Sequence, residues 1–375
     1  MADNETRPPD TDVGNDSANT TETTSQRRTI DKLHLVNFTA FRDLQMAFSP
    51  GINAIIGENG TGKTHILKVL YACCTLPRMG PDFEMGLQNY FIATFWKTWN
   101  LVNIDADPRR ASVRVTASDG VLSYDVWDHG ATESKNGNKI GHSTTGTMSS
   151  EPFKELPSVL IPAKEMLSHR KHFLETYAAR TLYFEKQYID ILNEAGLGPA
   201  KSLSPACERL LQRVSTAIGG DVEEFFDVFH VVNPPLYLEL TLVAEGLRKF
   251  VLLWLLIRNS SIGPGSILYW DEPEANLNPK LMRKMVEIML ELSRIGVQVF
   301  FATHDYVMLK WLDLLAKPED RVMYHALYRG DEKEIHCQSA STLTGLSNNA
   351  ILDTFAELYD AELDRTRRRL SHDRS

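Results

Sequence analysis

Cysteine is scarce in this sequence: four of its 375 residues are cysteines, and none has the spacing of metal ligands. Two of them, Cys73 and Cys74, fall on an apparent helix, where small buried thiols are expected. The sequence also lacks a charged-then-apolar signal peptide, so a reducing cytoplasm is the expected location. These absences argue against a disulfide-stapled or zinc-stabilised fold.

Long apolar runs and an excess of basic residues are missing too. The longest apolar stretch, Phe250–Ile257, is far too short to span a bilayer and indicates a buried helix, so no membrane partner is expected. The formal net charge of −9 excludes a general nucleic-acid coat. Basic residues within 170–186 and 365–369 would allow DNA or RNA contacts, but a solvated helix face and a solubilising tail are the favoured interpretation. What the sequence does contain is 43% apolar residues, enough for a substantial core in one fold or two lobes.

The stretch Gly57–Thr64, with the letters GENGTGKT, has the pattern of a phosphate-binding loop. It lies between 52–56, which reads as a short buried strand, and 65–74, which reads as an apolar-faced helix. Its glycines permit the tight backbone that aims N–H groups at phosphate oxygens, and the helix N-terminus adds a favourable dipole. Lys63 would reach the β- and γ-phosphates, and the Thr64 hydroxyl would bind Mg²⁺. The residues predicted to contact ATP are Gly57, Asn59, Gly60, Thr61, Gly62, Lys63 and Thr64.

An acidic pair follows a second apolar run, 266–270, which is typical of a central strand in a parallel sheet. Asp271 is placed to hold Mg²⁺, and Glu272 to orient or deprotonate the attacking water. A third run ends at His304, which would hydrogen-bond the γ-phosphate from the same face, although a lone histidine is more often structural. These motifs predict an enzyme that binds ATP with Mg²⁺ and hydrolyses it. The predicted catalytic residues are Lys63, Glu272 and His304, and the predicted metal ligands are Thr64 and Asp271.

The order of these parts resembles that of the ABC-class ATPases, especially the soluble heads of the DNA-repair and chromosome-maintenance type (RecF and SMC). The resemblance covers residues 33–75 and 236–305. It implies an α/β P-loop NTPase fold of the ABC-ATPase type, with a two-lobed mixed sheet, flanking helices and a short helical insertion. It also implies that Asn37 and Arg42, in the opening strand, approach the nucleotide, and that His304 is the switch histidine of the family.

The same resemblance implies a homodimer that forms on ATP. Gly246, at a helix start that is itself a possible anion site, falls at the signature motif, which in the family contacts the γ-phosphate bound by the opposite subunit. The stretch 276–278 falls at the D-loop, which crosses the family's dimer interface. The sequence departs from the family at Ala244, where a serine is usual. A hydroxyl contact to the opposite phosphate is thereby lost, while the backbone of Gly246 remains.

The sequence of residues 271–279 most resembles that of the stand-alone bacterial "AAA family" ABC-type ATPases, which include OLD- and Septu-type ATPases of anti-phage defence. In related proteins the ATPase works with a nuclease or toxin, so the resemblance implies control of a nucleic-acid-directed effector protein. Two alternatives stay open: a RecF-like ATPase of DNA repair and recombination, and the nucleotide-binding subunit of a transporter. The alanine at position 244 and the inserted helices argue against the transporter.

Composition divides the chain into five expected parts. These are a disordered tail (1–28), lobe I with the phosphate loop and antiparallel strands (29–162), a helical insertion (163–235), lobe II with the signature, acidic pair, D-loop and His304 (236–345), and a C-terminal helix with a basic tail (346–375). The insertion is expected to begin with one long amphipathic helix. In lobe I, 111–116 and 121–127 indicate a hairpin, and the polar stretch 130–150 a mobile loop.

Overall fold

The computed structural model describes most of the chain, and all statements below concern that part. The described residues are 28–75, 83–91, 101–103, 105–133, 139–180, 182, 184–330 and 334–372. The expected disordered tail, apart from Arg28, lies outside them. The described residues form an α/β fold with a five-stranded, a six-stranded and a three-stranded sheet.

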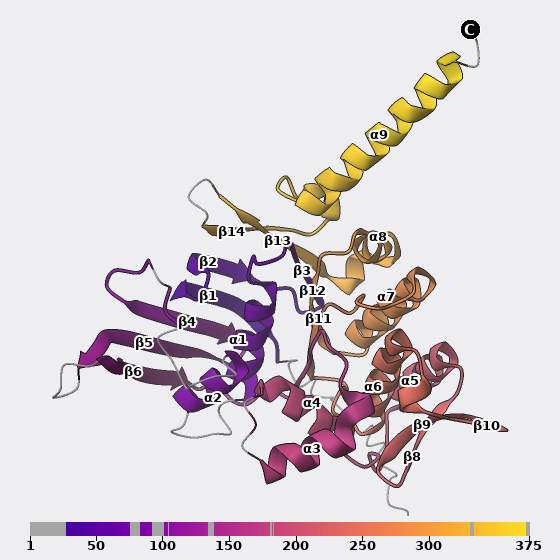
Figure 1. The fold of residues 1–375 in the computed structure, drawn as a ribbon, viewed down its shortest axis with the longest axis horizontal. Coiled ribbons are helices and arrows are strands. Elements are labelled where there is room, and N and C mark those ends of the chain that lie inside the picture. The colour runs from indigo at the N-terminus through magenta and orange to yellow at the C-terminus, as the bar shows by residue number, and fades with distance from the viewer. Residues whose placement is uncertain are drawn as a thin grey trace, which may run out of the picture.

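The six-stranded sheet forms the centre of the molecule (Figure 1). Its strands, in spatial order, are β14 (Ile335–Ala340), β13 (Val322–Arg329), β3 (Ile52–Gly57), β12 (Gln298–Thr303), β11 (Ile267–Asp271) and β7 (Ser158–Ile161). All neighbouring pairs are parallel except β13 with β14. The carboxyl ends of parallel strands meet at one edge, so the ends of β3, β11 and β12 are brought together there.

Two apolar cores lie on opposite faces of this sheet. In β11, Leu268 and Trp270 belong to one core, whereas Ile267 and Tyr269 belong to the other, as the alternation of a strand requires. The first core is covered by α5 (Pro205–Ile218), α6 (Glu245–Arg258), α7 (Pro279–Arg294) and α8 (Tyr306–Leu315). Burial on both faces explains why these strands read as continuous apolar runs.

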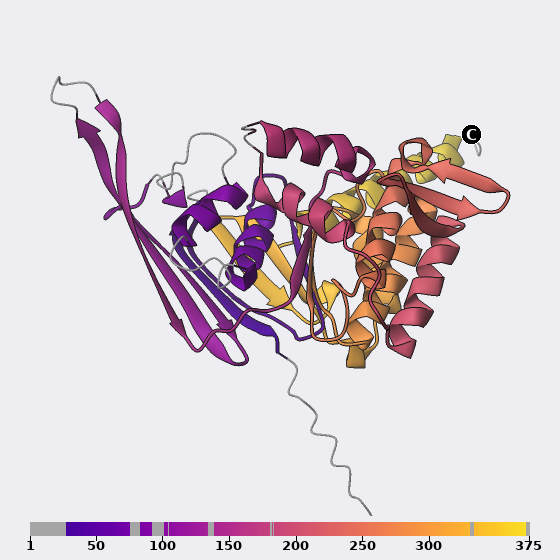
Figure 2. The same cartoon turned by 90° about the horizontal axis from the view of Figure 1, so that it is seen from below.

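The second core holds α1 (Lys63–Thr75) and α2 (Phe83–Phe91) together with the five-stranded antiparallel sheet (Figure 2). The strands of that sheet, in spatial order, are β2 (Phe41–Ala47), β1 (Ile30–Phe38), β4 (Arg110–Ala117), β5 (Gly120–Glu133) and β6 (Lys139–Glu151). The hairpin predicted around Asp119 and Gly120 is present as β4 and β5. The mobile loop predicted at 130–150 is wrong for its described residues, because β6, at the edge of the sheet, pairs with β5 along its length despite polar side chains.

The insertion at 163–235 is less helical than its sequence suggests. Instead of one long helix, a 3₁₀ turn (Leu167–His169) leads into α3 (Arg170–Ala179), which ends before α4 (Lys186–Ala195) begins. After α5, the strands β8 (Asp221–Phe225), β9 (Val228–Asn233) and β10 (Leu236–Glu239) form the three-stranded sheet. The tight turn at Phe226 and Asp227, both with positive φ, directs the chain into a hairpin, as such turns do. The division into lobes stays a prediction.

The C-terminal helix expected near 349–370 is α9 (Ala350–His372), which extends away from the body in Figure 1. Across the described part of the chain, no helix combines the length and the hydropathy needed to cross a membrane.

Candidate nucleotide-binding site

The loop between β3 and α1 has the backbone of a phosphate-binding loop. Gly57, Gly60 and Gly62 have φ values of 155°, 78° and 90°, which side chains of L-residues rarely adopt. At Gly62 a side chain is excluded as well, because a Cβ there would lie 2.5 Å from Cζ of Phe41. Within the loop, Thr61 is buried and donates its hydroxyl to the Glu58 carbonyl at 2.9 Å. The neighbouring loop residue Asn59 is exposed.

Lys63 is the first residue of α1, and its side chain lies along the loop that precedes it. Its Nζ donates to the carbonyl oxygens of Gly57 at 2.7 Å and Glu58 at 2.9 Å. The side chain is buried, and this burial lowers the pKa of Lys63 against the raising effect of nearby carboxylates. The ammonium is therefore fixed inside the loop at the helix N-terminus, where anion-binding sites form.

Thr64 and Asp271 join the phosphate loop to the end of β11. The Thr64 hydroxyl lies 2.9 Å and 3.1 Å from the two carboxylate oxygens of Asp271, although 207 residues separate them in sequence. Burial raises the pKa of Asp271 to about 6, and the Thr64 hydrogen bond opposes this rise. A hydroxyl and a buried carboxylate in contact are the protein ligands that Mg²⁺ takes beside nucleotide phosphates, so the residues fit the ion.

The structure gives this pair no further metal ligand of its own. Among the described residues, no group of three or more His, Cys, Asp and Glu side chains is arranged to hold a metal ion. Mg²⁺ bound by Thr64 and Asp271 would therefore take its other ligands from phosphate and water oxygens, which is the usual way this ion is held.

Glu272 and His304 lie side by side at the same edge of the sheet. The His304 Nδ1 is 3.4 Å from Oε1 of Glu272, and the two side chains are 47% and 32% exposed. Glu272 has a φ of 46°, in the left-handed region, and its N–H donates to the Ala302 carbonyl at 3.0 Å. The pair is thus accessible to solvent while its backbone is fixed by β12.

Glu274 is a functional candidate that sequence reasoning missed. It is 6% exposed, and its Oε1 accepts hydrogen bonds from the Thr303 hydroxyl at 2.7 Å and from the His304 N–H at 3.3 Å. Burial raises the pKa of Glu274. Its carboxyl group supports the backbone that carries His304. The sequence signal, a second acid two residues after the acidic pair, does not reveal which way the side chain points.

Gly246 is buried at the start of α6 and packs against the D-loop of its own chain. A Cβ at this position would lie 2.6 Å from the carbonyl oxygen of Asn276 and 3.1 Å from the Cα of Leu277. The side-chain amide of Asn276 also donates to Glu245 at 2.8 Å. The signature-like segment and the D-loop therefore form one packed unit.

Arg248 does not replace the hydroxyl that is missing at Ala244. Its guanidinium donates to Ser168, to Glu165 and to the carbonyl oxygens of Thr241 and Val243. Glu165 in turn accepts the backbone N–H of Ser168 at 3.1 Å and so caps a 3₁₀ turn. Ala244 itself is the N-cap of α6 and provides no side-chain hydrogen bond.

Asn37 lies in β1 and Arg42 in β2, and their approach to the nucleotide stays a prediction. The carbonyl of Asn37 accepts the N–H of Asn103, and the Arg42 guanidinium pairs with Glu334 and Asp105.

The arginine that contacts the phosphate loop is Arg329, which donates to the Gly60 carbonyl at 3.1 Å. Sequence reasoning missed Arg329 because only the pairing of β13 with β3 brings it to the loop.

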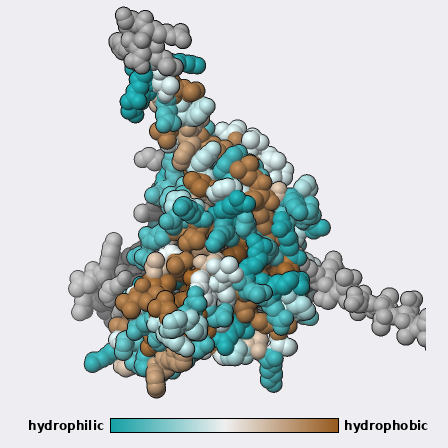
Figure 3. Space-filling view, turned by 90° about the vertical axis from the view of Figure 1, so that its right-hand side faces the viewer, coloured by the Kyte–Doolittle hydropathy of each residue, from teal (hydrophilic) through white to brown (hydrophobic). Residues whose placement is uncertain are grey.

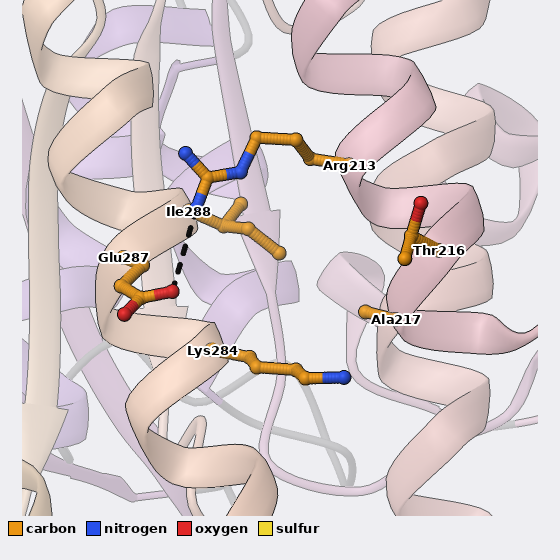
Figure 4. A pocket seen from close by; sticks show the side chains of 6 residues that line it. All are labelled: Arg213, Thr216, Ala217, Lys284, Glu287 and Ile288. Atoms are coloured by element: carbon orange, nitrogen blue, oxygen red, sulfur yellow. Dashed lines mark hydrogen bonds and ion pairs between the residues drawn. The ribbon is translucent and has the colours of Figure 1, made fainter.

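A surface pocket of about 170 Å³ lies away from this site, between α5 and α7 (Figure 4). Arg213 from α5 reaches across to Glu287 of α7 at 3.4 Å, and Lys284 lies below them. None of its lining residues belongs to the phosphate loop or the acidic pair.

Two segments of the chain match families of known proteins. Residues 186–310 match a family described as "AAA domain, putative AbiEii toxin, Type IV TA system", and residues 32–153 match one described as "AAA domain". A "DNA replication and repair protein RecF" from Cytophaga hutchinsonii is 33% identical over 94 residues, which are 23% of this chain and 25% of that protein. The RecF of Ligilactobacillus salivarius is 43% identical over 58 residues, 15% of each chain. These matches span a quarter or less of the relatives' length.

Solved structures decide the fold. An "SmcHead bound to the C-winged helix domain of ScpA" superposes with a TM-score of 0.52 at 13% identity, over 84% of this chain and 98% of the other. This chain has the fold of an SMC-type ATPase head, and two of its segments match AAA-domain families. An Smc head from Pyrococcus furiosus, solved "with an extended coiled coil", gives a TM-score of 0.50 at 12% identity, over 88% of this chain and 100% of that chain. The expected α/β fold of the ABC-ATPase type is therefore confirmed.

Proposed function

We propose that this chain binds ATP with Mg²⁺ and hydrolyses it at the edge where β3, β11 and β12 end. The observation that carries the proposal is the contact between Thr64 and Asp271, with Glu272 and His304 side by side next to it. Hydrolysis of a γ-phosphate needs a phosphate loop, a carboxylate in contact with the threonine of that loop, and an accessible carboxylate–imidazole pair.

Each residue of the site has a chemical role in this proposal. The loop N–H groups and Lys63 bind the phosphates and offset their charge. Mg²⁺, held by Thr64 and Asp271, would supply positive charge at the phosphate oxygens. Glu272 orients the attacking water and accepts its proton. His304 donates a hydrogen bond toward the γ-phosphate, and its position follows from the Glu274 contact to its backbone.

The active form in this proposal is a dimer that sandwiches two ATP molecules. The start of α6, with Gly246, would face the phosphate bound by the other copy, where its free N–H groups favour an anion. The resemblance to SMC-type heads supports this arrangement. Ala244 lacks the hydroxyl that the family uses, so we expect the ATP-bound dimer to be short-lived.

The output that we propose is control of a partner protein that acts on nucleic acid, as in anti-phage defence. Support comes from the resemblance of the sequence of residues 271–279 to that of anti-phage defence ATPases. It comes also from the matching family, whose description names a putative toxin of a toxin–antitoxin system. The second candidate is direct action on DNA in repair or recombination, which the local likeness to RecF proteins favours.

The enzymatic part is tested by phosphate release from ATP. Glu272→Gln should retain nucleotide binding but lose turnover by about a hundredfold or more, because the proton acceptor is removed. Lys63→Ala should lose nucleotide affinity. The matched control is Glu319→Gln, an exposed carboxylate on the 3₁₀ turn after α8, which should hydrolyse ATP at the parental rate. Parental turnover by Glu272→Gln would remove this residue from the reaction.

The two outputs are separated by what the stalled protein retains. Glu272→Gln, tagged and incubated with ATP and Mg²⁺, is isolated and examined for protein by mass spectrometry and for DNA or RNA by staining. A co-purifying nuclease or toxin-like protein supports effector control. DNA alone, released at moderate salt as phosphate contacts are, supports the RecF-like function.

A further inference from the structure

The end of β13 borders the phosphate loop on the side away from Asp271. In the central sheet, β13 and β12 flank β3 on opposite sides, and β11 with Asp271 lies beyond β12. The pairing of β13 with β3 runs to Leu327, opposite Gly57, and a Cβ on Gly57 would lie 2.6 Å from the Leu327 carbonyl oxygen. Arg329, the last residue of β13, lies beside Gly60. The strand therefore contacts the loop at its first two glycines.

The guanidinium of Arg329 lies directly against Gly60. Its Nη2 donates to the Gly60 carbonyl oxygen at 3.1 Å, and a Cβ on Gly60 would lie 3.1 Å from the same nitrogen. Gly60 also has a φ of 78°, which favours glycine. The missing side chain thus permits both the turn of the loop and the close approach of the arginine.

The charge of Arg329 is not neutralised by a carboxylate in the part of the chain that the structure describes. Its side chain is exposed, and its contact there is with the neutral carbonyl of Gly60. Nearby Arg42, by contrast, pairs with Glu334. The positive charge of Arg329 therefore adds to that of Lys63 and of the loop N–H groups. These like charges repel one another, whereas each of them attracts a phosphate group.

The peptide between Gly60 and Thr61 transmits the contact to the interior of the loop. The carbonyl and the N–H of a trans peptide point in opposite directions. The carbonyl accepts from Arg329, and the Thr61 nitrogen on the other side lies 3.4 Å from the Glu58 carbonyl oxygen. The ammonium of Lys63 contacts this same oxygen at 2.9 Å. A distance of 3.4 Å exceeds that of an ordinary N–H···O bond, so the Thr61 N–H can exchange this contact for a phosphate oxygen at little cost.

We propose that Arg329 is a positioning residue for nucleotide binding. It holds the peptide between Gly60 and Thr61 with its N–H toward the phosphates, and it places a positive charge behind that peptide. The inference rests on the proposed binding of ATP at this loop.

The position of Arg329 determines which step it affects. The N–H groups of a phosphate loop contact the α- and β-phosphates, which ATP and ADP share. Glu272 and His304 follow β11 and β12, on the other side of β3 from Arg329. Arg329 therefore contributes to the binding of both nucleotides and not to the hydrolytic step.

The test is replacement of Arg329 by methionine, which keeps an unbranched side chain and removes the charge and the donor. The Kd values of ATP and of ADP, each with Mg²⁺, should rise about tenfold or more, because a charged hydrogen bond is lost. KM should rise with them, while kcat stays within about twofold. Titration calorimetry and phosphate release measure these quantities. A loss confined to ATP, or a lower kcat at unchanged KM, would overturn the proposal, since either would place Arg329 at the γ-phosphate.

Arg329→Lys separates charge and hydrogen bonding from mere packing. Lysine keeps the positive charge and an N–H donor, so both Kd values should lie within about threefold of the wild type. The two variants should unfold in urea at the wild-type midpoint without nucleotide, because the side chain is exposed. A lysine variant that binds as weakly as the methionine variant would contradict the proposed role.

The matched control is Arg209→Met, an exposed arginine of α5. This helix covers the opposite face of the central sheet from α1, on the side of the molecule where hydrophilic and hydrophobic side chains lie intermixed (Figure 3). The control should bind both nucleotides as the wild type does. A wild type that binds neither nucleotide would overturn the proposed function and this inference with it. A wild type that binds and hydrolyses ATP, with Arg329→Met equal to it, would overturn this inference alone.

Discussion

The ammonium of Lys249 lies 2.7 Å from the main-chain carbonyl oxygen of Glu272. Lys249 is 2% exposed and comes from α6, one turn after Gly246. Burial lowers the pKa of Lys249, while Glu274 and other nearby carboxylates oppose this effect. Glu272 has a left-handed backbone that costs about 1 kcal/mol or more in a residue with a side chain. The lysine hydrogen bond stabilises this backbone, and with it the direction of the Glu272 carboxylate.

Replacement of Lys249 by methionine should lower kcat for ATP at least about tenfold and leave KM nearly unchanged, since a small misplacement of a catalytic group suffices for such a loss. Methionine fills a similar volume, but the Glu272 carbonyl loses a charged hydrogen bond worth about 1.5–3 kcal/mol. Phosphate-release kinetics and nucleotide titration measure the two effects separately. Lys280→Met, at an exposed position in the first turn of α7, is the matched control. A rise in KM at constant kcat would place Lys249 in nucleotide binding instead.

Asp271 makes stability depend on pH in an unusual direction. Its folded pKa of about 6 lies above the ordinary 3.8, so the folded protein binds this proton more tightly than the unfolded chain does. The contribution of Asp271 to unfolding free energy therefore falls as pH rises from about 4 to about 6, by up to about 3 kcal/mol in total. Asp271→Asn removes this penalty and leaves an amide that can accept from Thr64.

We therefore expect Asp271→Asn, without nucleotide, to be more stable than the wild type at pH 8, and the difference to shrink toward pH 4.5. Urea unfolding at both pH values measures it, with Asp360→Asn on exposed α9 as the control. The same variant should lose the Mg²⁺ dependence of nucleotide binding. A stability difference that is equal at both pH values would contradict a raised pKa of Asp271.

The sequence predicted those parts of the site whose chemistry is local. In Gly57–Thr64 the glycines indicate the backbone conformation of the loop, and Lys63 indicates that it binds phosphate. The strand before the loop is apolar because both faces of the sheet are buried. Asp271 and His304 were found for the same reason, since each follows a buried strand. The hydrogen bond between Thr64 and Asp271 then follows from the parallel order of β3, β12 and β11.

The contacts that sequence reasoning missed are long-range. Lys249 reads as one charged residue at the start of an apolar helix, and only the packing of α6 brings it to Glu272. Arg329 reaches the phosphate loop through the pairing of β13 with β3, across 269 residues. The strands β8 and β9 lie in a region whose sequence predicts helices, because each is only five or six residues long and too short to show a clear period. Their conformation is set by the turn at Phe226 and Asp227.

Gly246→Ala should destabilise the protein, although alanine is the better helix former by about 1 kcal/mol. The added Cβ would meet the backbone of Asn276 and Leu277, which cannot rotate away as a side chain does. Overpacking of this kind costs about 1–3 kcal/mol. The measurement is urea unfolding, together with hydrogen exchange at the D-loop, which should increase. If the Gly246→Ala protein is more stable than the wild type, the backbone of the D-loop moves aside at little cost in free energy.

Ala244→Ser should have the opposite effect on α6. Ala244 has the extended backbone of an N-cap, with φ −55° and ψ 137°, but its methyl group offers no side-chain acceptor to the first N–H groups of the helix. A serine hydroxyl at an N-cap stabilises by about 1 kcal/mol relative to alanine. The residue is exposed, so the added atom meets no steric barrier. Urea unfolding checks the gain against Ala244→Val, which provides no acceptor and should not stabilise.

The same serine restores the hydroxyl of the family signature, so in a Glu272→Gln background it should also slow dissociation of the ATP-bound dimer. Slower dissociation with no change in monomer stability would mean that the hydroxyl faces the opposite phosphate rather than its own helix.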